Sequence, residues 1–69
     1  MNIGHEIKTR RKVLSISQSD LADMAEISLA TLKNIERGVG NPSFETVEKL
    51  LEVLGLEMIF RVRNPFDRV

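Results

Sequence analysis

A serine stands directly before three separate segments whose apolar residues recur at helical spacing: Ser17, Ser28 and Ser43. A serine hydroxyl in this position accepts a hydrogen bond from a backbone N–H of the first turn, which helps a helix to begin there. Helices are therefore predicted over residues 18–25, 29–37 and 44–54. The short connections between them favour a compact, mainly α-helical chain.

The remaining helical pattern lies at the start of the chain. Ile3, Ile7 and Leu14 fall on one narrow stripe at 100° per residue, which predicts an amphipathic helix over residues 3–14.

The last predicted helix has five apolar residues that we expect to face inward: Phe44, Val47, Leu50, Leu51 and Leu54. Gly38 follows the third helix where a left-handed residue is commonly found.

Composition narrows the classes of function. The chain has 69 residues, 42% of them hydrophobic, which excludes disorder caused by low hydrophobicity but leaves little scaffold for an enzyme. It has no cysteine and a single histidine, His5, so we expect no catalytic residues, no metal site and no cofactor. No apolar run is long enough to cross a membrane and the first residues do not resemble a signal peptide, so a soluble cytoplasmic protein is predicted.

The periodicity of the apolar residues changes over residues 57–63. Apolar and charged side chains alternate there, with Ile59 as the exception, which predicts a β-strand. A lone strand leaves its backbone groups unpaired, and a second copy of the same strand is the simplest partner. We therefore expect a homodimer closed by these strands. The strand residues are Met58, Ile59, Phe60, Arg61 and Val62.

The outer face of the third predicted helix carries a distinctive set of charges. With Leu32 and Ile35 inward, its opposite face presents four residues and no carboxylate: Ala30, Lys33, Asn34 and Arg37. Asparagine can pair with adenine, and lysine or arginine with guanine, when a helix enters the major groove. The net charge of the chain is zero, with ten basic and ten acidic residues, so this local pattern matters more than the total. The charges alone leave open a second interpretation, a solvated face that lacks acids.

Three stretches of sequence, taken together, resemble the Xre-type, lambda-repressor-like helix-turn-helix family. They are Ser17-Gln18-Ser19-Asp20-Leu21-Ala22, then Ser28 through Ile35-Glu36-Arg37-Gly38, then Asn41-Pro42-Ser43-Phe44-Glu45-Thr46. The resemblance spans residues 3–56. It implies a bundle of four or five helices that binds double-stranded operator DNA as a dimer.

The resemblance also implies roles for single residues. Gln18 matches a glutamine that contacts a phosphate or steadies a side chain of the recognition helix. The positions that read the major groove correspond to Ser28, Leu29, Ala30, Lys33 and Asn34. Contacts to the DNA backbone correspond to Arg37, Asn41 and Ser43. Arg11 and Glu36 match a structural ion pair between the first and third helices.

The chain departs from the family pattern at several positions. Leu29 and Ala30 replace polar side chains, so they either touch thymine methyl groups or make base readout sparse. Val39 and Gly40 replace basic residues, which predicts modest affinity for DNA and a shallow salt dependence. Glu26 stands where relatives favour glycine, at a cost of about 1 kcal/mol if its backbone is left-handed.

The stretch Leu54-Gly55-Leu56-Glu57-Met58-Ile59-Phe60-Arg61 resembles the HipB-type antitoxin branch of the same family. This resemblance implies dimer pairing of the strands and a HipA-type serine/threonine kinase toxin as a partner. The predicted function is a sequence-specific, autoregulatory transcriptional repressor that acts as the antitoxin of such a pair. A free-standing repressor without a toxin, and an interaction module that no longer binds DNA, remain alternatives. The expected organisation is a DNA-binding domain over 1–56, a dimerisation strand over 57–63 and a short tail over 64–69.

Overall fold

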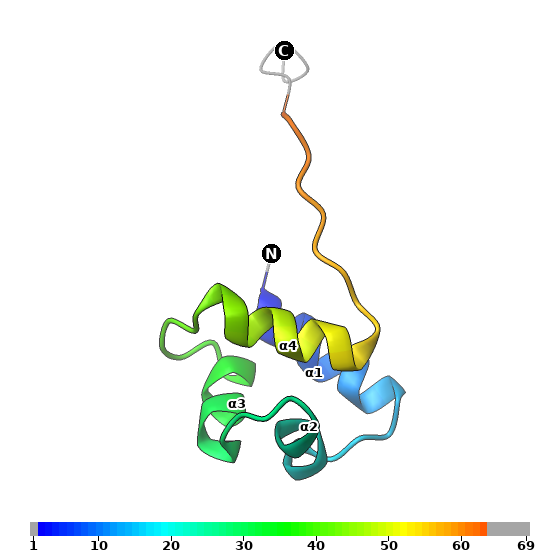
Figure 1. Cartoon of the computed structure of the whole chain (residues 1–69), viewed down its shortest axis with the longest axis vertical. Coiled ribbons are helices and arrows are strands. Elements are labelled where there is room, and N and C mark those ends of the chain that lie inside the picture. The colour runs from blue at the N-terminus through cyan, green and yellow to red at the C-terminus, as the bar shows by residue number, and fades with distance from the viewer. Residues whose placement is uncertain (1, 64–69) are drawn as a thin grey trace.

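A computed structural model describes residues 2–63 of the chain, and within that range the protein folds into four helices. The helices are α1 (Ile3–Val13), α2 (Gln18–Met24), α3 (Leu29–Glu36) and α4 (Phe44–Leu54). In Figure 1, α2 and α3 lie on one side of a layer formed by α1 and α4. The mainly α-helical prediction is confirmed, and the predicted helices differ from the observed ones by one residue at three C-terminal ends.

The three serines start their helices as predicted. The side-chain oxygens of Ser17, Ser28 and Ser43 accept hydrogen bonds from the backbone N–H three residues further on, at donor–acceptor distances of 3.0, 3.0 and 3.1 Å. Asn2 caps α1 in the same way, through the N–H of His5. Each such cap is worth about 1 kcal/mol, which is a large contribution in a domain of this size.

The core is a single apolar cluster to which all four helices contribute. Its largest fully buried side chains are Ile7, Leu21, Leu32, Leu50 and Leu54. Burying each of these contributes about 1.5–3 kcal/mol relative to leaving it exposed. The cluster therefore fixes the orientation of α3, because α3 contacts both α1 and α2 through it.

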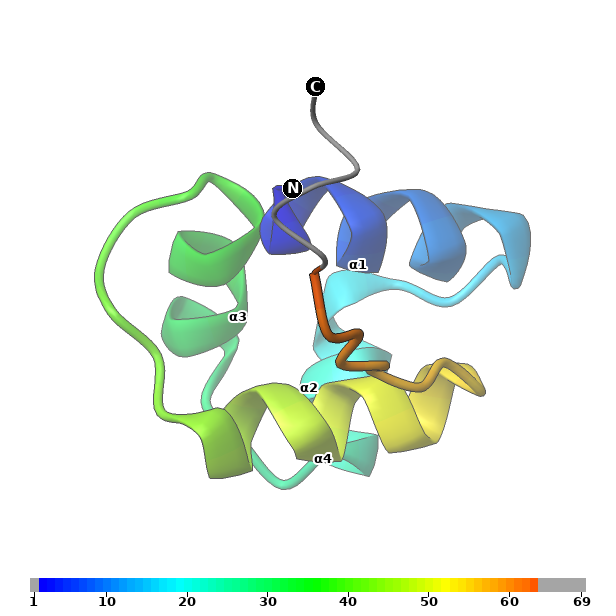
Figure 2. The ribbon, with the colours of Figure 1, turned by 90° about the horizontal axis from the view of Figure 1, so that it is seen from above.

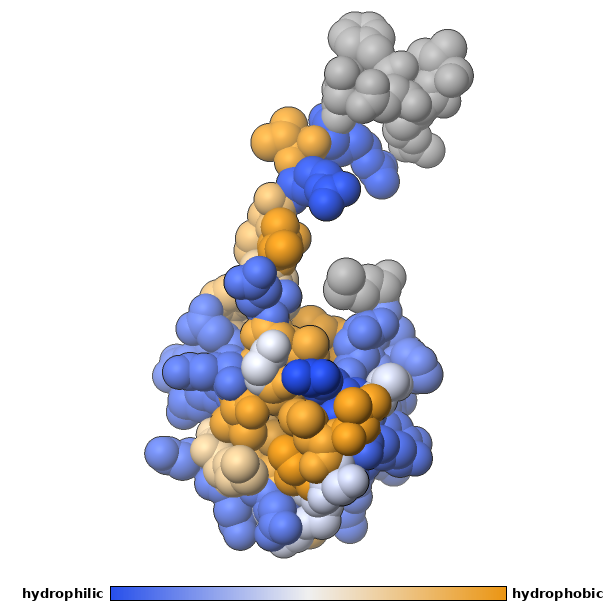
Figure 3. Space-filling view, turned by 90° about the vertical axis from the view of Figure 1, so that its right-hand side faces the viewer, coloured by the Kyte–Doolittle hydropathy of each residue, from blue (hydrophilic) through white to orange (hydrophobic). Residues whose placement is uncertain are grey.

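Two side chains predicted to face inward do not. Leu14 is 39% exposed because α1 ends at Val13, so Leu14 leaves the stripe formed by Ile3 and Ile7. Phe44 is 57% exposed because it occupies the first turn of α4, beyond the edge of the core. Figure 3 shows an apolar patch on the face where α1 and α4 end, and the exposed Val13 and Leu14 belong to this end of the bundle.

Within residues 2–63, left-handed backbone occurs before α2, on both sides of α3 and after α4, at Ser15, Glu26, Gly38, Gly40 and Gly55. Gly38 adopts φ +74° after α3, as predicted, and Glu26 adopts φ +58° in the connection between α2 and α3. A glutamate in this conformation costs about 1–2 kcal/mol relative to the right-handed region. The connection between α2 and α3 thus keeps its sharp turn at some expense in stability.

The predicted strand is not found within the described residues. Residues 57–63 form no strand and leave the bundle as an extended segment that rises above α1 and α4 (Figures 1 and 2). The reason is physical: a strand needs a neighbour, and every other regular element of the described chain is a helix. The predicted tail over 64–69 lies outside the described residues.

No helix among residues 2–63 is long and apolar enough to cross a membrane. The same residues contain no cluster of three or more histidine, aspartate or glutamate side chains arranged to hold a metal ion.

Candidate nucleic-acid interface

The outward face of α3 and the start of α2 form one shallow, open depression. Its lining consists of Gln18, Ala30, Lys33, Asn34 and Arg37. The depression exists because Leu32 and Ile35 are buried on the opposite side of α3, which turns the remaining side chains outward. Five of the nine residues predicted to contact DNA are thus brought together on one surface.

The single carboxylate of α3 does not contribute to this surface as a free charge. Glu36 Oε2 accepts a hydrogen bond from Arg11 Nε at 2.8 Å, and its Oε1 accepts one from Arg11 Nη2 at 3.0 Å. The two side chains, which the sequence led us to pair, are 10% and 3% exposed. Because the negative charge of Glu36 is neutralised inside the bundle, Lys33 and Arg37 dominate the outward face.

The ionisation of this pair follows from its contacts. Burial raises the pKa of Glu36, but the hydrogen bonds from Arg11 and Gln18, together with the positive charges of Arg11 and Lys8, bring the pKa below its ordinary value. The hydrogen bond to Glu36 raises the pKa of Arg11. Both groups are therefore charged near neutral pH, and the pair is a bidentate ion pair rather than a neutral contact.

Gln18 connects this buried pair to the surface. Its Nε2 donates a hydrogen bond to Glu36 Oε1 at 3.0 Å. Two roles were expected for Gln18: a contact to phosphate, or support for a side chain of the third helix. The structure contains the second kind of contact, to Glu36 of α3. The hydrogen bond holds the side-chain amide of Gln18, which lines the same depression as Lys33.

Asn34 is the amide at the centre of the candidate interface. Its Oδ1 accepts a hydrogen bond from Arg37 Nη2 at 2.5 Å, and its Nδ2 remains available as a donor. A bidentate contact to adenine needs both the oxygen and the nitrogen of the amide. The Oδ1 of Asn34 has two lone pairs, so it can accept a hydrogen bond from adenine while Arg37 stays bonded to it.

The other predicted contact residues lie around the depression rather than in it. Ser28 and Ser43 use their hydroxyls internally, since each donates to a threonine hydroxyl in the first turn of its helix. What they offer a phosphate is the set of free backbone N–H groups at the helix start. Leu29 is partly exposed at the start of α3, and Asn41 is exposed in the connection to α4.

Sequence reasoning missed the threonines that complete these two caps. Thr31 and Thr46 each stand three residues after the capping serine. The threonine hydroxyl oxygen accepts a hydrogen bond from the serine hydroxyl, at 2.8 Å in Thr31 and 2.9 Å in Thr46. The repeated spacing Ser-x-x-Thr was the pattern that could have revealed them. Their effect is to hold the serine hydroxyls within the fold and away from a ligand.

Two helices joined by a sharp turn, the second with an exposed basic face, define a helix-turn-helix domain. The model of the family described as Helix-turn-helix matches residues 7–60, which is most of the chain. The protein belongs to this family.

Among curated proteins, the chain is 38% identical over 58 residues to the immunity repressor protein of Bacillus phage phi105. It is 40% identical over 62 residues to an uncharacterised helix-turn-helix-type transcriptional regulator of Haemophilus influenzae. These alignments cover 84% and 86% of this chain but only 40% and 63% of the relatives. The chain thus spans about half the length of these relatives.

The fold is also similar to a solved structure. The crystal structure of SinR, a master regulator for biofilm formation, in complex with DNA matches with a TM-score of 0.74 and 39% sequence identity. The match covers 80% of this chain and 89% of the SinR chain. The predicted likeness to HipB-type antitoxins is not seen in these relatives and stays a prediction.

Proposed function

We propose that this protein is a transcriptional repressor that binds operator DNA by inserting α3 into the major groove. The observation that carries the proposal is the charge arrangement of α3. Its only carboxylate is neutralised by Arg11, while Lys33, Asn34 and Arg37 remain outward around one depression. A helix face of this kind can approach phosphates and base edges without repulsion.

The relatives support the same class of function. One is named an immunity repressor, and SinR has been crystallised with DNA. Under this proposal Lys33 and Asn34 read bases, and Gln18 and Arg37 position the helix against the backbone. The free backbone N–H groups at the starts of α3 and α4 bind phosphates, as does Asn41. Autoregulation, in which the protein binds upstream of its own gene, is part of the proposal.

We further propose that the protein acts as a homodimer. A two-fold axis places two α3 helices on half-sites one helical turn apart, about 34 Å. Residues 57–63 supply the pairing, because their backbone groups have no partner within one chain's bundle and the side chains of Ile59, Phe60 and Val62 are exposed. The division into a DNA-binding domain over 1–56 and a dimerisation segment over 57–63 follows from this.

A protein partner is the second candidate function. A structure of SinR in a complex with SinI matches this fold over 53% of that chain, so a protein that contains a similar domain has a protein partner. A kinase toxin remains one hypothesis for such a partner, and a free-standing repressor needs none. A toxin gene adjacent to the gene of this protein would favour the antitoxin role.

The test is a titration of the duplex upstream of the protein's own gene beside a scrambled duplex of equal length, repeated over a range of salt concentrations. Wild-type protein should prefer its own duplex and lose affinity with a shallow slope in log salt. Replacing Lys33→Ala together with Asn34→Ala should weaken specific binding by at least tenfold and leave the helical content unchanged.

Lys49→Ala is the matched control, since it removes an exposed positive charge from α4, away from the depression. It should change affinity by less than twofold. Equal binding of both duplexes by the wild type, or unchanged binding after the double substitution, would contradict the proposal.

A further inference from the structure

A second surface of the bundle is a groove beside α4 that the DNA-binding proposal does not use. Its apolar floor is formed by Phe44, Leu51, Leu56 and Met58. Its rim carries three carboxylates, Glu48, Glu52 and Glu57, and no basic residue lines it. We call this surface the α4 groove.

The carboxylates of the rim have no partner within the part of the chain that the structure describes. The single ion pair among residues 2–63 joins Arg11 to Glu36, and neither residue lines this groove. Three unpaired acids around exposed apolar surface attract a ligand that is both basic and apolar.

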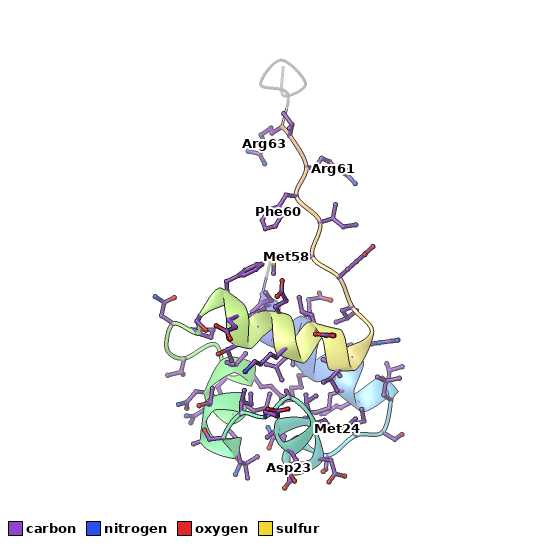
Figure 4. The ribbon with its side chains drawn as sticks, in the orientation of Figure 1. Asp23, Met24, Met58, Phe60, Arg61 and Arg63 are labelled. Carbon is purple, nitrogen blue, oxygen red and sulfur yellow. The ribbon has the colours of Figure 1, made fainter. Side chains whose placement is uncertain are left out.

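The extended segment 57–63 has that chemistry. Phe60 and Val62 are 80% and 95% exposed, and Arg61 and Arg63 are exposed between and beyond them. In Figure 4 the side chain of Arg61 leaves the segment on one side, and those of Phe60 and Arg63 leave it on the other. A groove with acids along its rim can therefore pair with arginines on both sides of the segment.

The first part of the segment already lines the groove of its own chain, through Glu57, Met58 and Phe60, but the residues beyond Phe60 cannot easily fold back into it. A return to the groove needs a tight turn, and residues 56–63 contain neither glycine nor proline. Gly55 is already committed as the left-handed residue that ends α4. At about 3.3 Å per residue, residues 57–63 extend roughly 20 Å away from the bundle (Figure 1).

We propose that the occupant of the α4 groove is the end of this segment from a second copy of the chain. Each copy contributes Arg61 and Arg63 to the rim of its partner, next to the partner's Glu48 and Glu52. Phe60, which borders the groove of its own chain, packs between the two copies beside the exposed Phe44. The exchange is reciprocal, as a two-fold interface requires.

This inference rests on the homodimer of the proposed function and specifies its contacts. It differs from strand pairing alone, which would leave Glu48 and Glu52 outside the interface. The charges of α4 therefore distinguish a dimer held by tail-to-groove docking from one held by the tails only.

The experiment is a charge exchange, with the dimer dissociation constant measured by sedimentation equilibrium in the absence of DNA. Replacing Glu48→Arg with Glu52→Arg should weaken the dimer at least tenfold, because arginines then face arginines. Replacing Arg61→Glu with Arg63→Glu should weaken it to a similar extent. The protein that carries all four substitutions should return to within about threefold of the wild-type constant.

The matched control is Asp20→Arg with Asp23→Arg, which makes the same change in charge at exposed positions of α2. Asp23 lies at the end of the bundle opposite the extended segment (Figure 4). Its dimer constant should stay within twofold of the wild type. Circular dichroism of every variant confirms that the bundle is folded.

Three results would overturn the proposal: a wild-type chain that stays monomeric, a dimer indifferent to the α4 substitutions, or a fourfold variant that does not recover. None of them depends on DNA, so each is separate from failure of the repressor function. The Lys33→Ala, Asn34→Ala variant should dimerise like the wild type. If the chain binds its operator but fails the charge exchange, the repressor proposal stands and the proposed docking of the segment in the α4 groove is wrong.

Discussion

The two sides of α3 are built for opposite purposes. On the inner side, Ile35 is buried and Glu36 makes three hydrogen bonds, two of them to Arg11. On the outer side, Lys33 and Arg37 are exposed, and neither forms an ion pair within the described residues. One helix of eight residues thus separates charge that stabilises the fold from charge that is free to bind.

The difference teaches how a chain of zero net charge can present a basic surface. The outer face of α3 is basic because the one carboxylate of this helix, Glu36, is buried and neutralised by Arg11 of α1. Substitutions on the inner side should therefore change the free energy of unfolding, and those on the outer side should change binding. The following variants test that separation on its inner side.

The largest effect is expected from Glu36→Ala. Removing one partner of a buried ion pair leaves the other charge uncompensated, at a cost of about 3–5 kcal/mol. A core of this size supplies only about 3–5 kcal/mol of net stability, so the variant should be largely unfolded in thermal and urea denaturation.

The control for this variant replaces both partners, Arg11→Met with Glu36→Leu. The double substitution leaves no buried charge and should cost far less than Glu36→Ala alone. Equal losses in the two proteins would mean that α1 and α3 are held by apolar packing and that the ion pair contributes little.

A smaller effect is expected from Gly4→Ala. Gly4 is buried where α1 crosses the end of α3, and an added Cβ would clash with the carbonyl oxygen of Ile35. Since that oxygen belongs to the backbone, the helices must separate, and we expect a loss of about 1–3 kcal/mol. Urea denaturation measures it.

Gly40→Ala provides the comparison, because a Cβ there meets nothing within 4 Å and only the left-handed backbone, φ +84°, opposes the change. Its cost should be about 1 kcal/mol. A Gly4→Ala variant no less stable than Gly40→Ala would contradict the close approach of α1 to α3.

The contrast between Gly4 and the serine caps shows what the sequence could reveal. Ser17, Ser28 and Ser43 act through bonds to residues three positions away, so local spacing was enough to place three helices. Gly4 acts through a residue 31 positions away, and the absence of a side chain leaves no periodic pattern to read. The pair of Arg11 and Glu36 was predicted from a family resemblance, because nothing in local spacing joins α1 to α3.

The exposed ends of the elements were harder to predict for a related reason. Helical periodicity assigned Leu14 and Phe44 to the core, but it does not say where the core stops. The alternation of residues 57–63 indicated an extended chain and could not supply a partner for it. On the outer face of α3, the charge pattern was enough to select Lys33, Asn34 and Arg37 as neighbours of one depression.

The smallest effect concerns the response of the inner face to acid. The pKa of Glu36 is lowered in the folded protein, so the unfolded chain binds the proton more readily. The contribution of Glu36 to stability is therefore fully present above its unfolded pKa, about 4.3, and is lost as pH falls through the folded value. Comparing urea denaturation at pH 6 and pH 3, the wild type should lose more stability than the Arg11→Met, Glu36→Leu protein, which has no carboxylate at position 36 and no uncompensated buried charge. Because the two proteins share every other carboxylate, the difference between them isolates Glu36. If the two proteins lost the same amount, the acid response of the fold would lie outside the pair of Arg11 and Glu36.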